Sequence, residues 1–155
     1  MAISPTLRKF LSDNAIAYDI LPHSPTVTSL NTAYAARIPG NKMAKSVVLE
    51  DEDGYLMAII PADEHVKIRE LNHALHRNMG LATEMELHHL FTDCMIGAIP
   101  PVGMAYGVKT VVDDRLLQSD DVYFEGGDHE ELVHVKGTSF RKMMNHSQHA
   151  NLCTH

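Results

Sequence analysis

Two apolar β-type segments joined by an acidic turn constrain the fold of this chain more than any other feature. Residues 45–49 read KSVVL, residues 55–60 read YLMAII, and the EDEDG between them is typical of a hairpin turn. This pattern predicts an antiparallel pair of strands. It excludes an all-helical bundle and makes an all-parallel sheet improbable.

Helical patterns alternate with further β-type segments along the rest of the chain. Apolar spacing and capping residues predict helices over 4–14, 27–37, 64–75, from Thr83 onward, and over 138–144. Further strands are expected over 16–21, 108–112, 122–125 and 132–135. Together they predict a mixed α/β (α+β) fold, a single compact domain whose curved, largely antiparallel central sheet is surrounded by helices. We expect this domain to span residues 1–145 and the polar, histidine-rich residues 146–155 to form a disordered tail.

Charge and cysteine content narrow the functional classes. The 13 Lys and Arg against 20 Asp and Glu give a formal charge of −7, which disfavours nucleic-acid binding through a broad cationic surface. Any RNA contact must therefore be local, and Arg37, Lys42, Lys45, Lys67 and Arg69 are candidates. Two distant cysteines do not suggest a disulfide scaffold, and no segment resembles a signal peptide or a membrane span. We expect a cytoplasmic protein that does not associate with membranes.

The loop GAIPPVG at 97–103 is the most informative short segment. Its two glycines bracket two adjacent prolines, so the backbone is rigid in the middle and permits close approach at the ends. The N–H groups of Gly97 and Ala98 could point at a carbonyl or an oxyanion, and Pro100 and Pro101 would form a fixed wall. A rigid connector is an equally good interpretation of the loop alone. Lys45, at the entry of an apolar strand, could meet an anion or could simply extend its ammonium into solvent.

Other residue patterns give weaker signals. The 11 histidines include His73 and His76, which could share a helical face, but no metal-ligand motif accompanies them, so no metal or other cofactor is expected. His129 follows Gly126-Gly127, whose backbone freedom could project the imidazole into a pocket; an exposed turn histidine is the alternative. No G-x-S-x-G, GxGxxG or P-loop motif is present, which argues against covalent catalysis and against dinucleotide or P-loop phosphate binding.

Four elements in order resemble the YbaK-like aminoacyl-tRNA editing family, which includes free-standing deacylases and the editing domain of bacterial prolyl-tRNA synthetases. They are His23-Ser24-Pro25, Lys45-Ser46, the loop at 97–103, and YFEGGDHEEL at 123–132. The resemblance runs from about Ile16 to Met144. The family's fold is a mixed α/β domain with a curved sheet, which agrees with the prediction from the residues.

The resemblance implies hydrolysis of the ester between a wrong amino acid and the 3′ end of a tRNA. It assigns catalytic roles to Lys45, which would hold the tRNA terminus, and to Gly97, whose amide would lie near the aminoacyl carbonyl. It implies substrate-binding roles for His23, Ser46, Ala98, Ile99, Pro100, Pro101, Gly103 and His129. The expected substrate is proline tRNA carrying a small amino acid such as alanine or cysteine, and prolyl-tRNA synthetase is a possible partner.

Two other functions remain open at this level. A non-catalytic module of the same fold would bind aminoacyl-tRNA or a nucleotide without cleaving it. An interaction domain would instead use its Met and His residues to cover a partner. The deacylase interpretation requires Lys45 and the loop at 97–103 to face each other across one pocket, and a structure that puts them on opposite faces would count against it. The sequence does not determine the oligomeric state, the tRNA or the amino acid removed.

Overall fold

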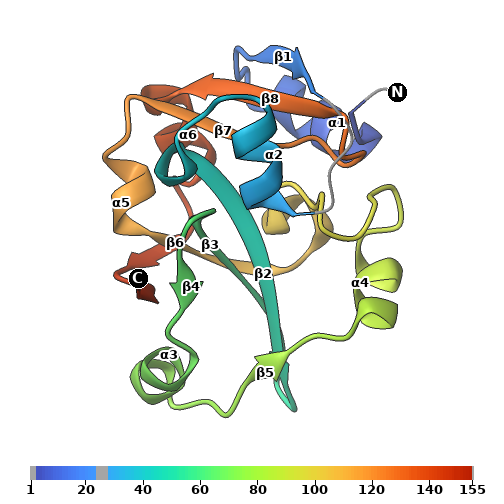
Figure 1. Ribbon diagram of the computed structural model, residues 1–155. Coiled ribbons are helices and arrows are strands. Elements are labelled where there is room, and N and C mark those ends of the chain that lie inside the picture. Colours follow the sequence, from blue (N-terminus) through green and yellow to red (C-terminus); the bar gives the residue numbers. More distant parts are fainter. Residues whose placement is uncertain (1–2, 24–27, 155) are drawn as a thin grey trace.

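The computed structural model describes residues 3–23 and 28–154, and its centre is an eight-stranded mixed sheet (Figure 1). Seven strands follow the order β1-β8-β7-β2-β3-β6-β9, and β5 pairs with β2 outside this path. Their bounds are β1 (Asp19–Pro22), β2 (Met43–Asp51), β3 (Gly54–Pro61), β5 (Gly80–Leu81), β6 (Lys109–Asp113), β7 (Asp121–Glu125), β8 (Glu131–Lys136) and β9 (Gln148–Ala150). Pairs β1–β8, β7–β8, β2–β3 and β2–β5 are antiparallel, whereas β2–β7, β3–β6 and β6–β9 are parallel. The predicted mixed fold with a mostly antiparallel sheet is confirmed.

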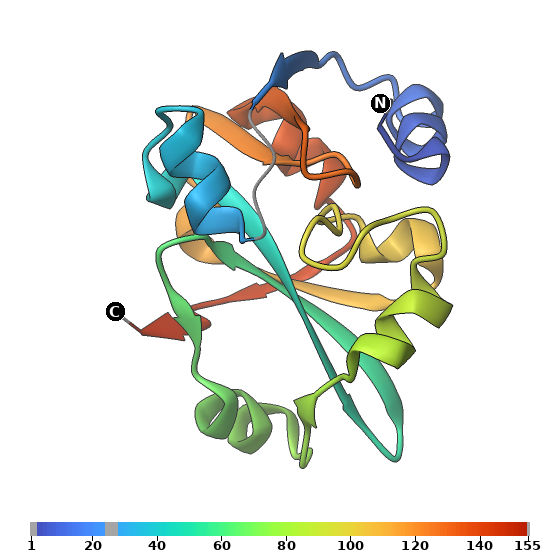
Figure 2. The same ribbon diagram turned by 45° about the vertical axis from the view of Figure 1, so that its right-hand side comes forward.

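Helices surround this sheet, and a small second sheet pairs β4 (His65–Val66) with β10 (Cys153–Thr154) (Figure 2). The α-helices are α1 (Pro5–Asp13), α2 (Ser29–Ala35), α3 (Ile68–Leu75), α4 (Glu84–Leu90), α5 (Asp114–Leu117) and α6 (Gly137–Met143). Two 3₁₀ helices, η1 (Gly40–Lys42) and η2 (Gly103–Tyr106), complete the set. The third helix begins four residues later than the expected Glu64, since β4 occupies its first turn. None of the helices in the described part of the chain has the length and hydrophobicity of a membrane span.

Side chains along β3 point alternately to the two faces of the sheet, and each face carries its own hydrophobic core. Met57 and Ile59 face the larger core, which α1 and α6 cover with Leu7, Leu11 and Phe140. Leu56, Ala58 and Ile60 face the second core, which α3 covers with Leu71. A third, smaller cluster lies under α2 and contains Ala33, Met43, Ala62 and Leu132.

A gap in strand pairing exposes one edge of β2. Along the edge opposite β3, residues 43–44 of β2 pair with β7 and residues 49–50 pair with β5. The Ala82 N–H also reaches the Val48 carbonyl, at 3.0 Å. Residues 45–47 therefore have no strand partner on this edge within the described chain. Lys45 and Ser46 both lie at this gap.

The structure corrects the prediction of a disordered tail. β9 adds to the edge of β6, β10 pairs with β4, and Leu152 and Cys153 are 2% and 3% exposed. Asp113 anchors the segment, because its Oδ2 accepts hydrogen bonds from the Leu152 N–H at 2.9 Å and the Cys153 thiol at 3.0 Å. The error arose because two isolated buried residues give no periodic signal.

Replacement of Asp113 by Asn should destabilise the protein through the tail. Burial alone would raise the pKa of Asp113, but its hydrogen bonds to Cys153 and Leu152 outweigh burial and lower the pKa below its ordinary value. We expect Asp113→Asn to lower the free energy of unfolding in urea at pH 7 by roughly 1–3 kcal/mol. A group with a depressed pKa stabilises above its unfolded pKa, so the difference should shrink as pH falls through the folded pKa.

Asp120→Asn is the matched control, because Asp120 is exposed and lies outside the tail. A loss of stability as large in this variant as in Asp113→Asn would contradict the tail-anchoring role.

Candidate functional site

Two side chains hold the loop at 97–103 against the gap in the sheet. The Ser46 hydroxyl donates to the Ile99 carbonyl at 3.0 Å, which ties the loop to β2. His129, 6% exposed, bonds the Ile96 carbonyl through Nε2 from the turn between β7 and β8. The Met95 N–H reaches Gly127 of the same turn, at 2.8 Å. The loop is therefore fixed from both sides.

The bond from His129 sets the orientation of the peptide between Ile96 and Gly97. A carbonyl can only accept, so Nε2 must carry the proton in this contact. In a trans peptide the C=O and N–H groups point in opposite directions, so the Gly97 N–H faces away from the imidazole. Gly97 is exposed, and its N–H has no hydrogen bond within the described chain. Its φ of 84° is left-handed, which favours glycine at this position.

The remaining loop residues pack into the protein. Ala98, Ile99, Pro100 and Pro101 are buried, and the Ala98 N–H donates to the Met95 carbonyl at 3.1 Å. The expectation that the Ala98 amide points at a ligand is therefore wrong, whereas the Gly97 amide is available. Gly103 starts η2, and a Cβ there would lie 2.5 Å from Thr110 Oγ1, so close packing explains this glycine.

A partly buried polar network fixes the segment that leads into the loop. Asp93 accepts hydrogen bonds from the Tyr106 hydroxyl at 2.7 Å, the Ser4 hydroxyl at 2.8 Å and the Thr6 N–H at 2.9 Å. Burial would raise the pKa of Asp93, but these donors outweigh burial and hold the pKa well below its usual range. An ionised Asp93 therefore joins α1, η2 and the loop.

Lys45 leaves β2 on the face opposite Ser46, because neighbouring strand residues alternate. Its ammonium donates to the Ala62 carbonyl at 3.3 Å. Burial lowers the pKa of Lys45, and the nearby carboxylates of Asp63 and Glu64 oppose this effect. Lys45 and the loop do not form facing walls of a closed pocket. The expected pairing of Lys45 with the loop across one pocket is therefore not observed, since Lys45 lies on the sheet face of Ile60 and the loop lies on the face of Ile59.

His23 lies in a buried acid cluster behind the loop. Its Nε2 is 3.5 Å from Glu125 Oε1, with the two side chains 1% and 3% exposed. Burial raises the pKa of Glu125, whereas Thr32, His23 and His129 oppose the rise. Asp128 caps the same turn, accepting from the N–H groups of Glu130 and Glu131 at 3.0 Å each. Ser24 and Pro25, which also contributed to the resemblance, lie outside the described residues.

Sequence reasoning missed Thr32, Glu125 and Asp128 as members of this cluster. The acidic residues in EGGDHEEL are typical of an exposed turn, yet Glu125, Asp128 and His129 are only 2%, 4% and 6% exposed. Their burial depends on the packing of α2 and residue 23 over the end of β7. A polar buried residue has no periodic signal that reveals this packing.

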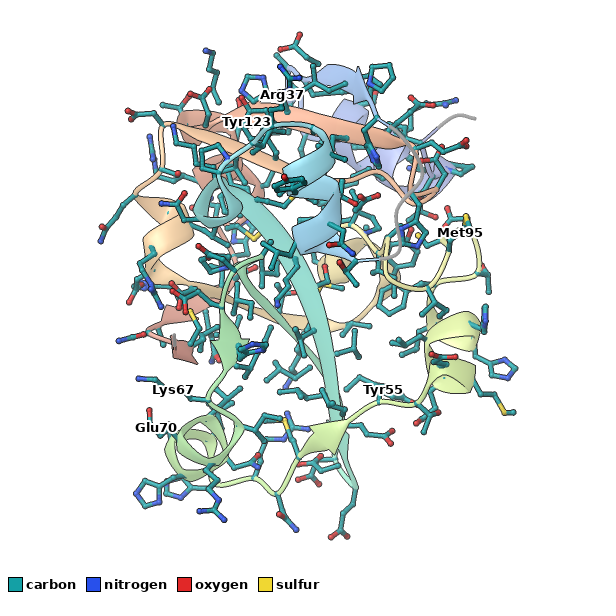
Figure 3. All side chains as sticks on the ribbon, viewed as in Figure 1. Arg37, Tyr55, Lys67, Glu70, Met95 and Tyr123 are labelled. Atoms are coloured by element: carbon teal, nitrogen blue, oxygen red, sulfur yellow. The ribbon has the colours of Figure 1, made fainter. Side chains whose placement is uncertain are left out.

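The basic residues that the sequence suggested for RNA contact do not form one patch. Arg37 lies near α2 at the top of Figure 3, whereas Lys67 lies beside α3 at the lower left, with Glu70 3.5 Å away. Arg37 lies after the end of α2, Lys42 is the last residue of η1 and Lys45 lies in β2. None of these three residues has a carboxylate within 4.0 Å in the described chain, and Lys45 lies in the gap itself.

The thiols of this chain are poor nucleophiles. Burial raises the pKa of Cys94 to about 12, and burial together with Asp113 raises that of Cys153 to about 12. Both are free cysteines, and the thiolate is the nucleophilic form. Within the described residues, no group of three or more His, Cys, Asp or Glu is arranged to hold a metal.

A comparison with family models decides the family. Residues 23–143, more than half of the chain, match the aminoacyl-tRNA editing domain. The chain belongs to the aminoacyl-tRNA editing domain family. The predicted resemblance is thus confirmed, and the match includes Lys45, the loop at 97–103 and His129. A comparison with curated protein sequences finds no match.

Solved structures share the fold of this editing domain. A hypothetical protein named APE2540 has a TM-score of 0.84 at 20% identity, covering 96% of this chain and 99% of its own. A proposed trans-editing enzyme for prolyl-tRNA synthetase also has a TM-score of 0.84 at 20% identity, covering 99% and 100%. A protein of Marinobacter aquaeolei VT8 with a proposed role in signal transduction has a TM-score of 0.80 at 20% identity, and the match covers 97% of this chain but 30% of that chain.

Removal of the Ser46 hydroxyl should loosen the loop of the editing domain. Ser46→Ala leaves the Ile99 carbonyl without its donor, which should cost roughly 1 kcal/mol. We expect faster amide hydrogen exchange at Ile99 and Val102, with little change in the core strands. Ser12→Ala, at an exposed position of α1, is the control. Unchanged exchange in the loop of Ser46→Ala would contradict the anchoring role.

Proposed function

We propose that this protein is a trans-acting aminoacyl-tRNA deacylase. The observation that carries the proposal is the orientation of the Ile96–Gly97 peptide: His129 holds the carbonyl, and the exposed Gly97 N–H remains available beside the gap in β2. Membership of the editing domain family supports the same reaction class. Lys45 lies at the same unpaired edge.

The reaction needs a positioned water and stabilisation of negative charge. Water attacks the ester carbonyl carbon, and the carbonyl oxygen becomes an oxyanion to which the Gly97 N–H donates. The bond to the ribose oxygen then breaks, and the proton lost by water reaches that oxygen. The products are a free amino acid and a tRNA with a free terminal hydroxyl. No protein nucleophile is needed, in agreement with the raised thiol pKa values.

Lys45 would hold the tRNA terminus through a phosphate. Because Lys45 and Ser46 leave β2 on opposite faces, the terminal nucleotide would cross the unpaired edge at residues 45–47. The phosphate would lie on the Lys45 side and the ester on the loop side. Arg37 and Lys42 extend the cationic surface from this edge, which fits a local RNA contact on an acidic protein.

We propose proline tRNA carrying alanine or cysteine as the substrate, with prolyl-tRNA synthetase as a partner that presents the tRNA. The name of one similar structure, a proposed trans-editing enzyme for prolyl-tRNA synthetase, supports this choice. The buried side chains of Ile99, Pro100 and Pro101 stiffen the wall beside Gly97 and favour a small aminoacyl group. His129 and Ser46 act as positioning residues for this wall, and His23 supports it through Glu125.

Hydrolysis of a panel of charged proline tRNAs tests this function. The panel carries alanine, cysteine, serine or proline, and we expect the wild type to release alanine or cysteine but not proline. Lys45→Ala should lower kcat/KM about 10- to 100-fold, since a charge-assisted hydrogen bond contributes roughly 1.5–3 kcal/mol. Lys136→Ala is the matched control, because Lys136 is exposed at the end of β8 and lies 3.6 Å from Asp121.

Filter retention of the same tRNAs distinguishes the alternative binding module. A protein that retains aminoacyl-tRNA and protects its ester from hydrolysis would overturn the deacylase proposal. If the wild type hydrolyses the charged tRNA and Lys45→Ala does so equally well, the deacylase activity stands but the role assigned to Lys45 is wrong.

The pH profile of deacylation should report the Lys45 ammonium. Burial lowers the pKa of Lys45 from the ordinary 10.5, so the charged form disappears at lower pH than for an exposed lysine. We expect enzymatic kcat/KM, after subtraction of spontaneous hydrolysis, to fall on the alkaline side as pH approaches this lowered pKa. Lys45→Arg, which stays charged, should lack that fall. The same alkaline fall in both proteins would contradict this assignment.

A further inference from the structure

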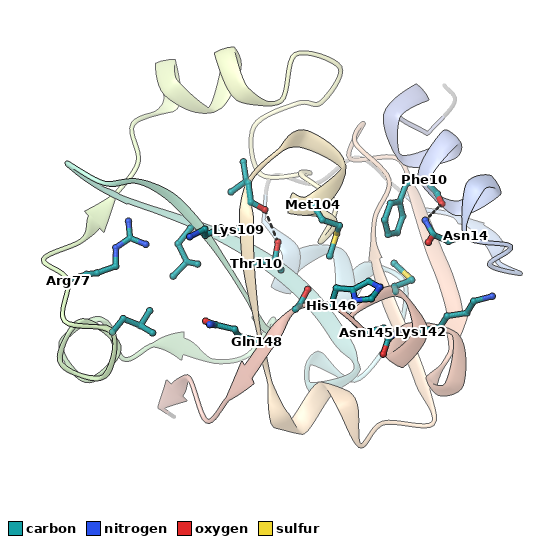
Figure 4. A pocket seen from close by; sticks show the side chains of 15 residues that line it. Phe10, Asn14, Arg77, Met104, Lys109, Thr110, Lys142, Asn145, His146 and Gln148 are labelled. Carbon is teal, nitrogen blue, oxygen red and sulfur yellow. Dashed lines mark hydrogen bonds between the residues drawn. The ribbon is translucent and has the colours of Figure 1, made fainter.

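A large cavity lies apart from the candidate editing site. It has a volume of about 670 Å³, within the range of small-molecule sites, and lies among α1, η2, β6, the end of α6 and β9 (Figure 4). Its lining includes none of the residues assigned to the editing site: Lys45, Ser46, Gly97, His129 and His23 are all absent from it. The cavity therefore needs its own explanation.

The interior of the cavity is apolar. Phe10 of α1, Met104 of η2 and Met143 of α6 line one part, and Leu56 and Val108 line another. Phe10 and Met104 are only partly buried by the protein's own core. These side chains offer an apolar surface that a hydrocarbon chain or ring system would cover.

The charge of the lining is opposite to that of the protein. None of the 15 lining residues is Asp or Glu, although the chain has 20 acidic residues against 13 Lys and Arg. Lys109 and Lys142 lie toward opposite ends of the cavity in Figure 4. Both are exposed, and neither has a carboxylate within 4.0 Å among the ion pairs of the described chain. Arg77 is different, because Asp51 already binds its guanidinium at 2.6 Å.

Polar groups beside the cations could orient a bound anion. β9 pairs with β6 only from Val111 onward, so the preceding Lys109 and Thr110 have no strand partner on that edge in the described chain. The side chains of Asn145 and Gln148 also line the cavity and are exposed. They offer amide donors next to the two lysines.

We propose that this cavity binds an amphipathic anion, an apolar chain or ring system that carries a carboxylate or a phosphate. The apolar interior takes the hydrophobic body, and Lys109, at the unpaired edge of β6, binds the charged group. The inference does not rest on the editing function, because the two sites share no assigned residue. It explains why acidic residues are absent from the lining of this cavity in an acidic protein.

Binding of three ten-carbon probes tests the chemistry. Decanoate, decyl phosphate and decanol share a chain, and the first two distinguish a carboxylate from a phosphate as the preferred group. Each is titrated below its aggregation concentration at low salt by displacement of the fluorescent sulfonate 8-anilinonaphthalene-1-sulfonate. We expect at least one anion to bind saturably and at least 10-fold more tightly than decanol.

Two lysine variants with the same change in net charge locate the site. Lys109→Gln should weaken binding of the anion 5- to 10-fold and leave decanol unaffected. Lys136→Gln, in which an exposed lysine of β8 is changed, should leave both unaffected. Equal affinities in the two variants would show non-specific charge attraction and overturn the proposal.

A bulky substitution tests the location independently of charge. Gln148 is exposed on β9 and lines the cavity, so Gln148→Trp should fold and fill part of the space. We expect at least 10-fold weaker anion binding, with the urea midpoint of unfolding close to that of the wild type. Unchanged binding in this folded variant, or no saturable binding of either anion to the wild type, would overturn the proposal.

Discussion

The gap in strand pairing along β2 is the constraint on which the site depends. β3 pairs with one edge of β2 throughout, but β7 and β5 pair with only the two ends of the other edge. The bond between Ser46 and the Ile99 carbonyl, at 3.0 Å, holds a loop beside the edge left open. In the proposed site, the ligand would lie at this open edge.

The loop combines rigidity with one available donor. Pro100 and Pro101 cannot donate, the Ala98 N–H already bonds Met95, and His129 holds the carbonyl of the Ile96–Gly97 peptide. The Gly97 N–H remains as the exposed donor of this peptide. A donor that is fixed before the reaction needs no reorganisation when negative charge develops, which makes it effective in stabilising an oxyanion. The family of the chain fits such chemistry, since an aminoacyl ester is already activated toward water.

Much of the fold could be predicted because its signals are local. The hairpin of β2 and β3, the Thr83 capping box of α4 and the helix α6 all depend on residues near in sequence. The tail could not be predicted, because β9 and β10 depend on contacts with β6, β4 and Asp113 that lie far away in sequence. Lys45, Gly97 and His129 were found from a family pattern. Glu125 and Thr32 were missed, because only the packed structure shows that they are buried beside His23.

The most direct measurement of the central claim is the amide NMR spectrum of the protein with an inert substrate analogue. In 3′-alanylamido-3′-deoxyadenosine 5′-monophosphate, an amide replaces the scissile ester and the phosphate is retained. The account predicts that the largest shifts occur at the Gly97 amide and at residues 45–47 of β2. Lys45→Ala should weaken the binding. Shifts confined to other surfaces, with Gly97 unaffected at saturation, would contradict the assignment of this edge as the site of deacylation.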